Sequence, residues 1–230
     1  MSMANYPCRL ILVRHGEAHC NVDNLVCGER SCTGLTERGR QQAELLGEFL
    51  ARGDDGCRIS ALYSTTAARA RHTAESVGKA LGRTVIPQLL APNYGAAEGK
   101  PWPEVIAAFG QTPALAPHLP LAEGTESWIS LVQRTSRELE TIVRRHYGET
   151  VMVVGHEETV VAAAQHFLQL LPWSRAEVTF GVDFTSQTVW QRERLSWCDP
   201  DEERWRWRLV RHNDLRHLEG LGGPPSMGMY

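Results

Sequence analysis

The sequence lacks any apolar run that approaches the roughly 18–20 residues needed to cross a membrane. Its N-terminus, MSMANYPCRLILV, has a short apolar stretch but no cleavage-site pattern, so no signal peptide is expected. Strong charge is also absent, because the 230 residues carry a formal net charge of only −3. We therefore expect neither a nucleic-acid partner nor a membrane partner, and any anion-binding site must be local.

The sequence also lacks the cysteine patterns of metal and disulfide proteins. It has six cysteines, but no CxxC pair occurs and the chain is not a small cysteine-dense one. The spacing of Cys20, Cys27 and Cys32 matches no common zinc site. These observations predict reduced thiols, a cytoplasmic location and no metal centre.

Proline is scarce except in one segment, because half of the twelve prolines fall within residues 91–124. This segment is predicted to be a long irregular excursion, with a helix around 102–109. Long loops in compact domains often form substrate walls, so we expect it to cover the substrate. The rest of 1–219 is expected to form the same single domain, whereas the Gly-, Pro- and Met-rich residues 220–230 are predicted to be a disordered tail.

Apolar periodicity predicts alternating strands and helices. Short apolar runs predict strands at 9–13, 59–63, 83–86 and 150–154, with terminal strands at 178–190 and 205–211 joined by a charged turn at 199–203. Helical patterns cover 36–52, which Thr36 caps, and 65–81, 127–147 and 160–171. This order indicates an α/β sandwich with a mostly parallel central sheet, in which ligands bind at the carboxyl ends of the strands.

Two of these strands lead directly into a histidine. Val13 precedes Arg14-His15, and Val154 precedes Gly155-His156. A neutral imidazole is nucleophilic near pH 7, and a guanidinium can neutralise phosphate oxygens through two parallel hydrogen bonds. An isolated Arg-His pair is common and is usually structural, so the surrounding sequence must decide between the two interpretations.

Five segments supply that context, and they occur in one order: RHGEAHCN at 14–21, TGLTERGRQQA at 33–43, LYSTTAARARHTA at 62–74, GTESWISLVQR at 124–134 and VMVVGHEETV at 151–160. Together they resemble the histidine phosphatase superfamily, the phosphoglycerate-mutase-like proteins, over roughly residues 9–217. The resemblance implies a three-layer α/β/α sandwich and a phosphatase that needs no metal and no cofactor.

The resemblance also implies a role for each matching residue. His15 corresponds to the nucleophile that becomes phosphohistidine, and Arg14 and Arg69 correspond to the arginines that clamp phosphate. His156 matches the second pocket histidine, which is expected to donate to phosphoryl oxygens. Asn21 matches the asparagine that closes the phosphate loop. Cys27 and Gly28 match a further phosphate contact and the loop glycine beside it.

One position departs from the family pattern. The family's usual acid is the glutamate of an L-x-E-x-x-[FY]-G segment, where this chain has LLAPNYG and therefore Ala91. The acid-phosphatase and phytase branch instead carries an acid directly after the second histidine. Glu157 is in that position, and we predict that it donates the proton and later activates water. Glu158 and Glu98 are alternatives, and Glu157 and Glu158 could also simply charge a helix N-terminus.

The leading functional hypothesis is a phosphoric monoester hydrolase acting on a small phosphorylated metabolite. The second is phosphoglycerate-mutase-type phosphoryl transfer, which the loss of glutamate at Ala91 weakens. The third is a phospho-ligand-binding protein that has lost turnover. Trp190, Trp197, Trp205 and Trp207 make one end of the chain rich in aromatic residues. Core packing is the default explanation for them, and a homodimer interface is the alternative.

Overall fold

A computed structural model describes residues 8–53, 58–195 and 204–221. Six strands form one sheet in the order β3-β2-β4-β1-β5-β6. The strands are β1 (Arg9–Arg14), β2 (Ile59–Thr65), β3 (Val85–Leu89), β4 (Thr150–Gly155), β5 (Gln187–Arg194) and β6 (Trp205–Asp214). The first four strands in that order pair in parallel, and β5 and β6 are antiparallel. The predicted mostly parallel sheet is therefore confirmed.

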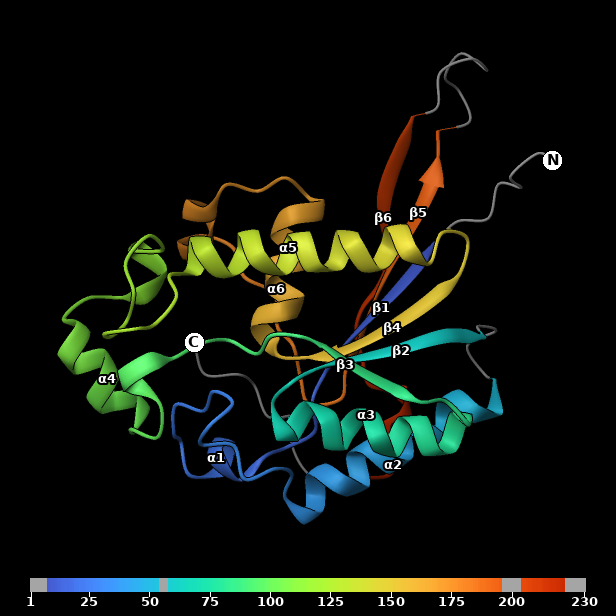
Figure 1. Cartoon of the computed structure of the whole chain (residues 1–230), viewed down its shortest axis with the longest axis horizontal. Helices are drawn as coiled ribbons and strands as arrows, with labels where there is room; N and C mark the ends of the chain where they lie inside the picture. Colours follow the sequence, from blue (N-terminus) through green and yellow to red (C-terminus); the bar gives the residue numbers. More distant parts are fainter. Residues whose placement is uncertain (1–7, 54–57, 196–203, 222–230) are drawn as a thin grey trace.

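Helices cover both faces of this sheet, which gives the predicted three layers (Figure 1). α2 (Glu37–Arg52) and α3 (Ala68–Leu81) lie on one face, and α5 (Trp128–Arg145) and α6 (Glu157–Phe167) lie on the other. The shorter helices α1 (His19–Val22) and α4 (Trp102–Phe109) lie beyond the carboxyl ends of the parallel strands. None of the described helices is long and apolar enough to span a bilayer.

Strand β1 shows why the sheet needs two helical layers. Successive side chains of a strand point to opposite faces. Leu10 and Leu12 pack into the apolar cluster formed with α5 and α6, whereas Ile11 and Val13 pack into the cluster formed with α2 and α3. All four side chains are fully buried. A continuous apolar run is therefore the sequence signature of a strand covered on both sides.

The helix boundaries partly follow the predictions. Thr36 caps α2 as expected, because its hydroxyl accepts a hydrogen bond from the Gly39 amide. The predicted helix at 65–81 begins only at Ala68, because β2 continues through Thr65. The predicted helix at 160–171 instead begins at Glu157 and ends at Phe167, with His156 as its N-terminal cap residue.

The terminal hairpin corrects one prediction. The strand expected at 178–190 begins only at Gln187, and residues 177–186 form an irregular segment whose Thr185 amide hydrogen-bonds the Arg14 carbonyl. β6 begins at Trp205 as predicted. The expected turn at 199–203 and the tail beyond residue 221 lie outside the described residues.

Two of the four tryptophans near the end of the chain pack within the fold. Trp190 is 1% exposed, and Trp207 stacks on Phe167 with ring centroids 4.3 Å apart. Their packing agrees with the core interpretation. Trp197 lies outside the described residues, and the homodimer stays a prediction.

The segment 91–124 contains more local structure than the proline pattern suggests. It holds η1 (Gly95–Ala97), α4, at the bounds predicted for a helix there, and η2 (Pro113–Leu115). A further short helix, η3 (Pro172–Ala176), follows α6, and η4 (Arg216–Leu218) follows β6. In Figure 1 the segment lies at one end of the molecule, beyond the carboxyl ends of the parallel strands.

Candidate active site

The two histidines meet because β1 and β4 are parallel neighbours. Arg14 is paired with Gly155 in the strand register, and the His15 amide donates a hydrogen bond of 2.9 Å to the Gly155 carbonyl. His15 and His156 therefore leave the sheet side by side, with ring centroids 5.2 Å apart. Both rings are almost completely buried.

Two glycines allow the loop after β1 to pack against the start of α2. A Cβ atom on Gly16 would lie 2.5 Å from the carbonyl oxygen of Gly39, and one on Gly39 would lie 2.0 Å from that of Glu17. Neither position tolerates a side chain without backbone movement. The Glu17 carboxylate also accepts a hydrogen bond from the Thr36 hydroxyl at 2.7 Å. The loop that carries His15 is thus held by backbone contact with the N-terminus of α2.

Hydrogen bonds determine which nitrogen of His15 carries the proton and which carries the lone pair. Nδ1 lies 2.7 Å from the Gly16 carbonyl oxygen, which can only accept, so Nδ1 carries the proton. Nε2 accepts a hydrogen bond of 3.0 Å from Nε of Arg69. Burial lowers the pKa of His15 well below its usual value, and the positive charges of Arg69 and Arg14 lower it further. The ring is therefore a neutral imidazole with its lone pair on Nε2.

Arg69, near the start of α3, is oriented by neutral acceptors. Its Nη1 donates to the Cys27 thiol at 3.3 Å and to the Gly28 carbonyl at 3.0 Å, and its Nη2 donates to the Cys27 carbonyl at 2.8 Å. None of these partners carries a formal charge, and the side chain is buried. A buried guanidinium held in this way is a strong site for an anion.

Arg14 supplies a second buried guanidinium. Nη1 donates to the Val182 carbonyl and lies 3.2 Å from a Glu157 carboxylate oxygen, and the guanidinium carbon lies 4.2 Å above the Phe184 ring. Its Nε is buried and has no hydrogen-bond partner among the described residues. Buried polar groups are normally hydrogen-bonded, so this donor has unused capacity for a ligand.

His156 also has a buried polar atom without a hydrogen-bond partner among the described residues. Its Nε2 lies 2.9 Å from the hydroxyl of Thr65, while its buried Nδ1 has no partner within the described part of the chain. Burial lowers the pKa of His156 well below its usual value, with further contributions from Arg69 and His15. The neutral ring is held in place by Thr65 at the end of β2, the strand on the other side of β4 from β1.

Glu157 is the first residue of α6 and lines the same pocket as the two histidines. Burial raises the pKa of Glu157 to about 7; the positive charge of Arg14 opposes this shift, and Glu158 adds to it. The ion pair with Arg14 does not outweigh burial here, because only 24% of the Glu157 side chain is exposed. A carboxyl group with such a pKa can donate a proton and later accept one near neutral pH.

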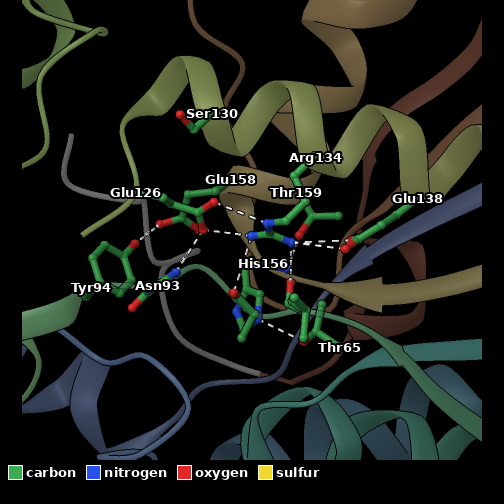
Figure 2. Close-up of polar contacts among 12 residues, drawn as sticks. Thr65, Asn93, Tyr94, Glu126, Ser130, Arg134, Glu138, His156, Glu158 and Thr159 are labelled. Carbon is green, nitrogen blue, oxygen red and sulfur yellow. Dashed lines mark hydrogen bonds and ion pairs between the residues drawn. The ribbon is translucent and has the colours of Figure 1, made fainter. Parts of the chain in front are cut away.

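Glu158 is engaged differently, as Figure 2 shows. Its carboxylate accepts a hydrogen bond of 2.5 Å from the Tyr94 hydroxyl. Burial and the Glu158 charge raise the pKa of Tyr94 well above its usual value, so the phenol keeps its proton and donates. Glu98 is more distant, because it accepts hydrogen bonds from Arg30 and Ser31 and does not line the pocket.

The family's usual acid position is occupied by a buried alanine, Ala91. Figure 2 shows Arg134 of α5 between Glu126 and Glu138, with hydrogen bonds of 2.7 Å to Glu126 and 3.3 Å to Glu138. The same guanidinium donates to the carbonyls of Leu90 and Ala91. This network fixes the start of the 91–124 segment but offers no acid at residue 91.

These side chains line a pocket of about 210 Å³, which we call the phosphate pocket. Of the residues predicted for the site, it is lined by Arg14, His15, Asn21, Cys27, Arg69, His156 and Glu157. Gly28 does not line it and contributes through its carbonyl to Arg69. Asn21 also accepts a hydrogen bond of 3.1 Å from the Ala18 amide. Among the described residues, no cluster of three or more His, Cys, Asp or Glu suits a metal ion.

The sequence did not single out Thr65, which contacts His156, or Phe184, which lines the pocket. A helix was predicted from residue 65, whereas Thr65 ends β2 at the same sheet edge as the histidines, and that position was the available signal. Phe184 fell within a predicted strand, so nothing marked it as a pocket residue. The structure places Thr65 against His156 and Phe184 below Arg14.

Comparison with known proteins agrees with this geometry. The family model described as histidine phosphatase superfamily (branch 1) matches residues 10–213, almost the whole described chain. The chain belongs to the histidine phosphatase superfamily. The family predicted from the five segments is therefore confirmed, and so is its fold.

Several relatives of this superfamily member are curated or solved. It is 30% identical to phosphoserine phosphatase 1 of Hydrogenobacter thermophilus, over 79% of this chain and 85% of that protein. It is 36% identical to a 2,3-bisphosphoglycerate-dependent phosphoglycerate mutase of Streptomyces griseus, over 47% of this chain and 44% of the mutase. Among solved structures, Bacillus stearothermophilus YhfR matches with a TM-score of 0.72 and 26% identity, over 92% of this chain and 99% of YhfR. The chain spans only about half the length of several of its curated relatives.

Proposed function

We propose that this protein is a metal-independent phosphatase that hydrolyses a phosphate monoester of a small metabolite through phosphohistidine at His15. The observation that carries the proposal is the Nε2 lone pair of a neutral, buried imidazole directly beside the Arg69 guanidinium. Phosphoryl transfer needs mainly positioning and charge stabilisation, and this pocket offers both.

In the first step, Nε2 of His15 attacks phosphorus in line with the ester bond. The P–N bond forms as the P–O bond breaks, and the leaving alkoxide takes the proton of the Glu157 carboxyl group. Arg14 and Arg69 stabilise the charge on the equatorial oxygens, and His156 contributes a further contact. The products of this step are the free alcohol, phosphohistidine and the Glu157 carboxylate.

In the second step, the Glu157 carboxylate removes a proton from a water molecule whose oxygen attacks phosphorus. The P–N bond breaks, its electron pair returns to Nε2, and inorganic phosphate leaves. Glu157 is then protonated again, so the cycle closes with one ester and one water consumed. The pKa of Glu157, about 7, supports both of its roles.

The relatives support a small phosphorylated metabolite as substrate, because phosphoserine phosphatases are among them. The free thiols Cys8, Cys20, Cys27 and Cys32 support a reducing, cytoplasmic location. The predicted homodimer is tested by light scattering of the purified chain.

Phosphoglycerate-mutase-type transfer is the second candidate, because mutases are also among the relatives. A mutase must protect phosphohistidine from water, and Glu157 beside the nucleophile favours water attack instead. Incubating 3-phosphoglycerate with and without its bisphosphate separates the two. A mutase forms 2-phosphoglycerate, whereas a phosphatase forms none in either mixture.

Trapping of the phosphoenzyme tests the proposal directly. Rapid acid-free quenching with p-nitrophenyl phosphate should leave one phosphoryl group on His15, detected by mass spectrometry. His15→Ala should lose the label and reduce phosphate release by at least about 10⁴-fold. Because p-nitrophenolate leaves without an acid, a wild-type protein that neither labels nor turns over this ester is a binding protein and not a phosphatase.

A further inference from the structure

A second and larger cavity adjoins the phosphate pocket. Its volume is about 390 Å³, compared with about 210 Å³ for the phosphate pocket. The two share Tyr94, Trp102, Glu157 and Glu158 as lining residues. We call the larger cavity the apolar chamber. Tyr94 and Glu158, which are hydrogen-bonded to each other, are among the residues that line both cavities.

Apolar side chains from separate elements line most of the chamber. Trp102 and Ile106 come from α4, Leu119 and Leu121 come from the segment after η2, and Trp128 and Leu131 come from the start of α5. Leu119 is 39% exposed, whereas Leu131 is 5% exposed, so the chamber extends from solvent into the core. Apolar walls with a few polar groups at one end are typical of small-molecule sites.

The charges of the chamber disfavour an anionic occupant. Glu157 and Glu158 lie at the boundary with the phosphate pocket, and Glu126 lines the wall but is neutralised by Arg134. Arg175 is the single basic residue of the lining. Its guanidinium carbon lies 3.9 Å above the Trp128 ring, and Glu158 interacts electrostatically with it. The carboxylate of phosphoserine or phosphoglycerate would therefore meet the Glu158 carboxylate near the phosphate pocket.

We propose that the apolar chamber holds the organic group of the substrate, and that this group is uncharged, largely apolar and at least the size of a substituted phenyl ring. The inference rests on the proposed phosphatase function, because it assigns the leaving group of that reaction. Glu157 would then protonate the ester oxygen at the boundary between the two cavities, where the phosphoryl group and the organic group join.

Two sets of substrates test the assignment. Phenyl phosphate and 4-tert-butylphenyl phosphate have similar leaving groups but differ in apolar size. We expect the larger ester to have a kcat/KM about tenfold higher or more, since each buried methyl group contributes to binding. Among alkyl esters, 3-phenylpropyl phosphate should exceed phosphoserine and phosphocholine by at least about tenfold.

A substitution that fills the chamber can be compared with the same substitution at the neighbouring residue, which lies outside the chamber. Ala114 lines the chamber, whereas its neighbour Leu115 is 67% exposed and does not. Ala114→Trp should lower kcat/KM for the tert-butyl ester more than for phenyl phosphate, and so bring the ratio between the two esters toward one. Leu115→Trp should leave both values unchanged. Equal thermal melting of the two variants shows that both fold.

Binding measurements test the assignment of the chamber independently of the proposed phosphatase reaction. Calorimetry with phenylphosphonate and 4-tert-butylphenylphosphonate needs no turnover, and the larger ligand should bind about tenfold more tightly. Equal affinities, or a preference for phosphoserine or phosphocholine, overturn the assignment of the chamber even if the enzyme is an active phosphatase. Tighter binding of the larger phosphonate without any hydrolysis upholds the chamber and overturns the proposed reaction instead.

Discussion

The phosphate pocket and the apolar chamber share a wall but are built in different ways. In the pocket, His15, His156 and Thr65 are placed by the ends of adjacent strands, and the register of the sheet leaves them little freedom. The chamber is lined by α4, the loops around it, η3 and parts of α5 and α6, and no strand of the sheet lines it. The chemical groups therefore depend on the sheet, whereas the shape of the chamber depends on the 91–124 segment.

This contrast separates two kinds of substitution. Changes in the pocket should reduce turnover whatever the apolar size of the organic group, because every ester presents the same phosphoryl group; only loss of the acid should depend on how readily the leaving group departs. Changes in the chamber should alter only the ranking of esters. The following three substitutions in the pocket test the first half of this statement, from the largest effect to the smallest.

Loss of the Arg69 guanidinium should have the largest effect of the three. Arg69→Ala should lower kcat/KM by about 10³-fold for phenyl and tert-butylphenyl phosphate alike, because it removes a buried positive charge that stabilises the phosphoryl oxygens. Arg71→Ala, on the exposed side of the same helix, is the control and should be neutral. If Arg69→Ala changes the two esters by clearly different factors, the separation of pocket from chamber fails.

Glu157→Gln should have an intermediate effect that depends on the leaving group. Alkyl phosphates need a proton donor, so their kcat should fall by about 10²–10³-fold, whereas p-nitrophenyl phosphate should lose much less in its first step. Glu158→Gln is the control and should leave the ratio between the two substrates unchanged. Phosphate-release assays with single-turnover kinetics measure both steps.

The pH profile of the wild-type enzyme sharpens the same prediction. Because the pKa of Glu157 is about 7, its protonated form is lost as the pH rises above that value. The kcat for an alkyl phosphate should therefore fall about tenfold for each pH unit above the pKa of Glu157. This decrease at alkaline pH should be absent in Glu157→Gln. A wild-type profile that stays flat to pH 9 contradicts Glu157 as the acid.

Thr65→Val should have the smallest effect. It removes the hydrogen bond of 2.9 Å to His156 and leaves Nε2 of that ring without its partner, so kcat/KM should fall about five- to tenfold for all esters. Thr65→Ser should restore activity, because the hydroxyl returns. Thr66→Val, on the adjacent residue, is the control. Steady-state kinetics with phenyl phosphate distinguish these variants.

Much of the pocket could be predicted because its residues are adjacent to strong local signals. His15 and His156 directly follow apolar strands, and parallel strands bring their carboxyl ends to one edge. The family resemblance added Arg69, which no local pattern marks. The extra strand length through Thr65 was missed, because a threonine at a strand end has no distinctive signature.

The chamber could not be predicted, because it depends on contacts between distant segments. Ile106, Leu131 and Arg175 have nothing in common in the sequence, and each has an ordinary explanation within its own helix. The irregular residues before β5 were mistaken for part of a strand, since alternation of apolar residues does not reveal where pairing with β6 ends. A cavity is a property of packing, and sequence periodicity describes only single elements.

The pairing of Arg14 with Gly155 links the ligand to the assembly of the whole molecule. His15 and His156 belong to opposite halves of the chain, so a phosphate ion can contact both only after β4 has docked beside β1. Bound phosphate therefore favours the fully assembled sheet by mass action. Substitutions that destabilise the sheet far from the pocket should therefore be partly compensated by added phosphate. The increase in folding stability with phosphate concentration then reports how tightly the folded state binds the ion.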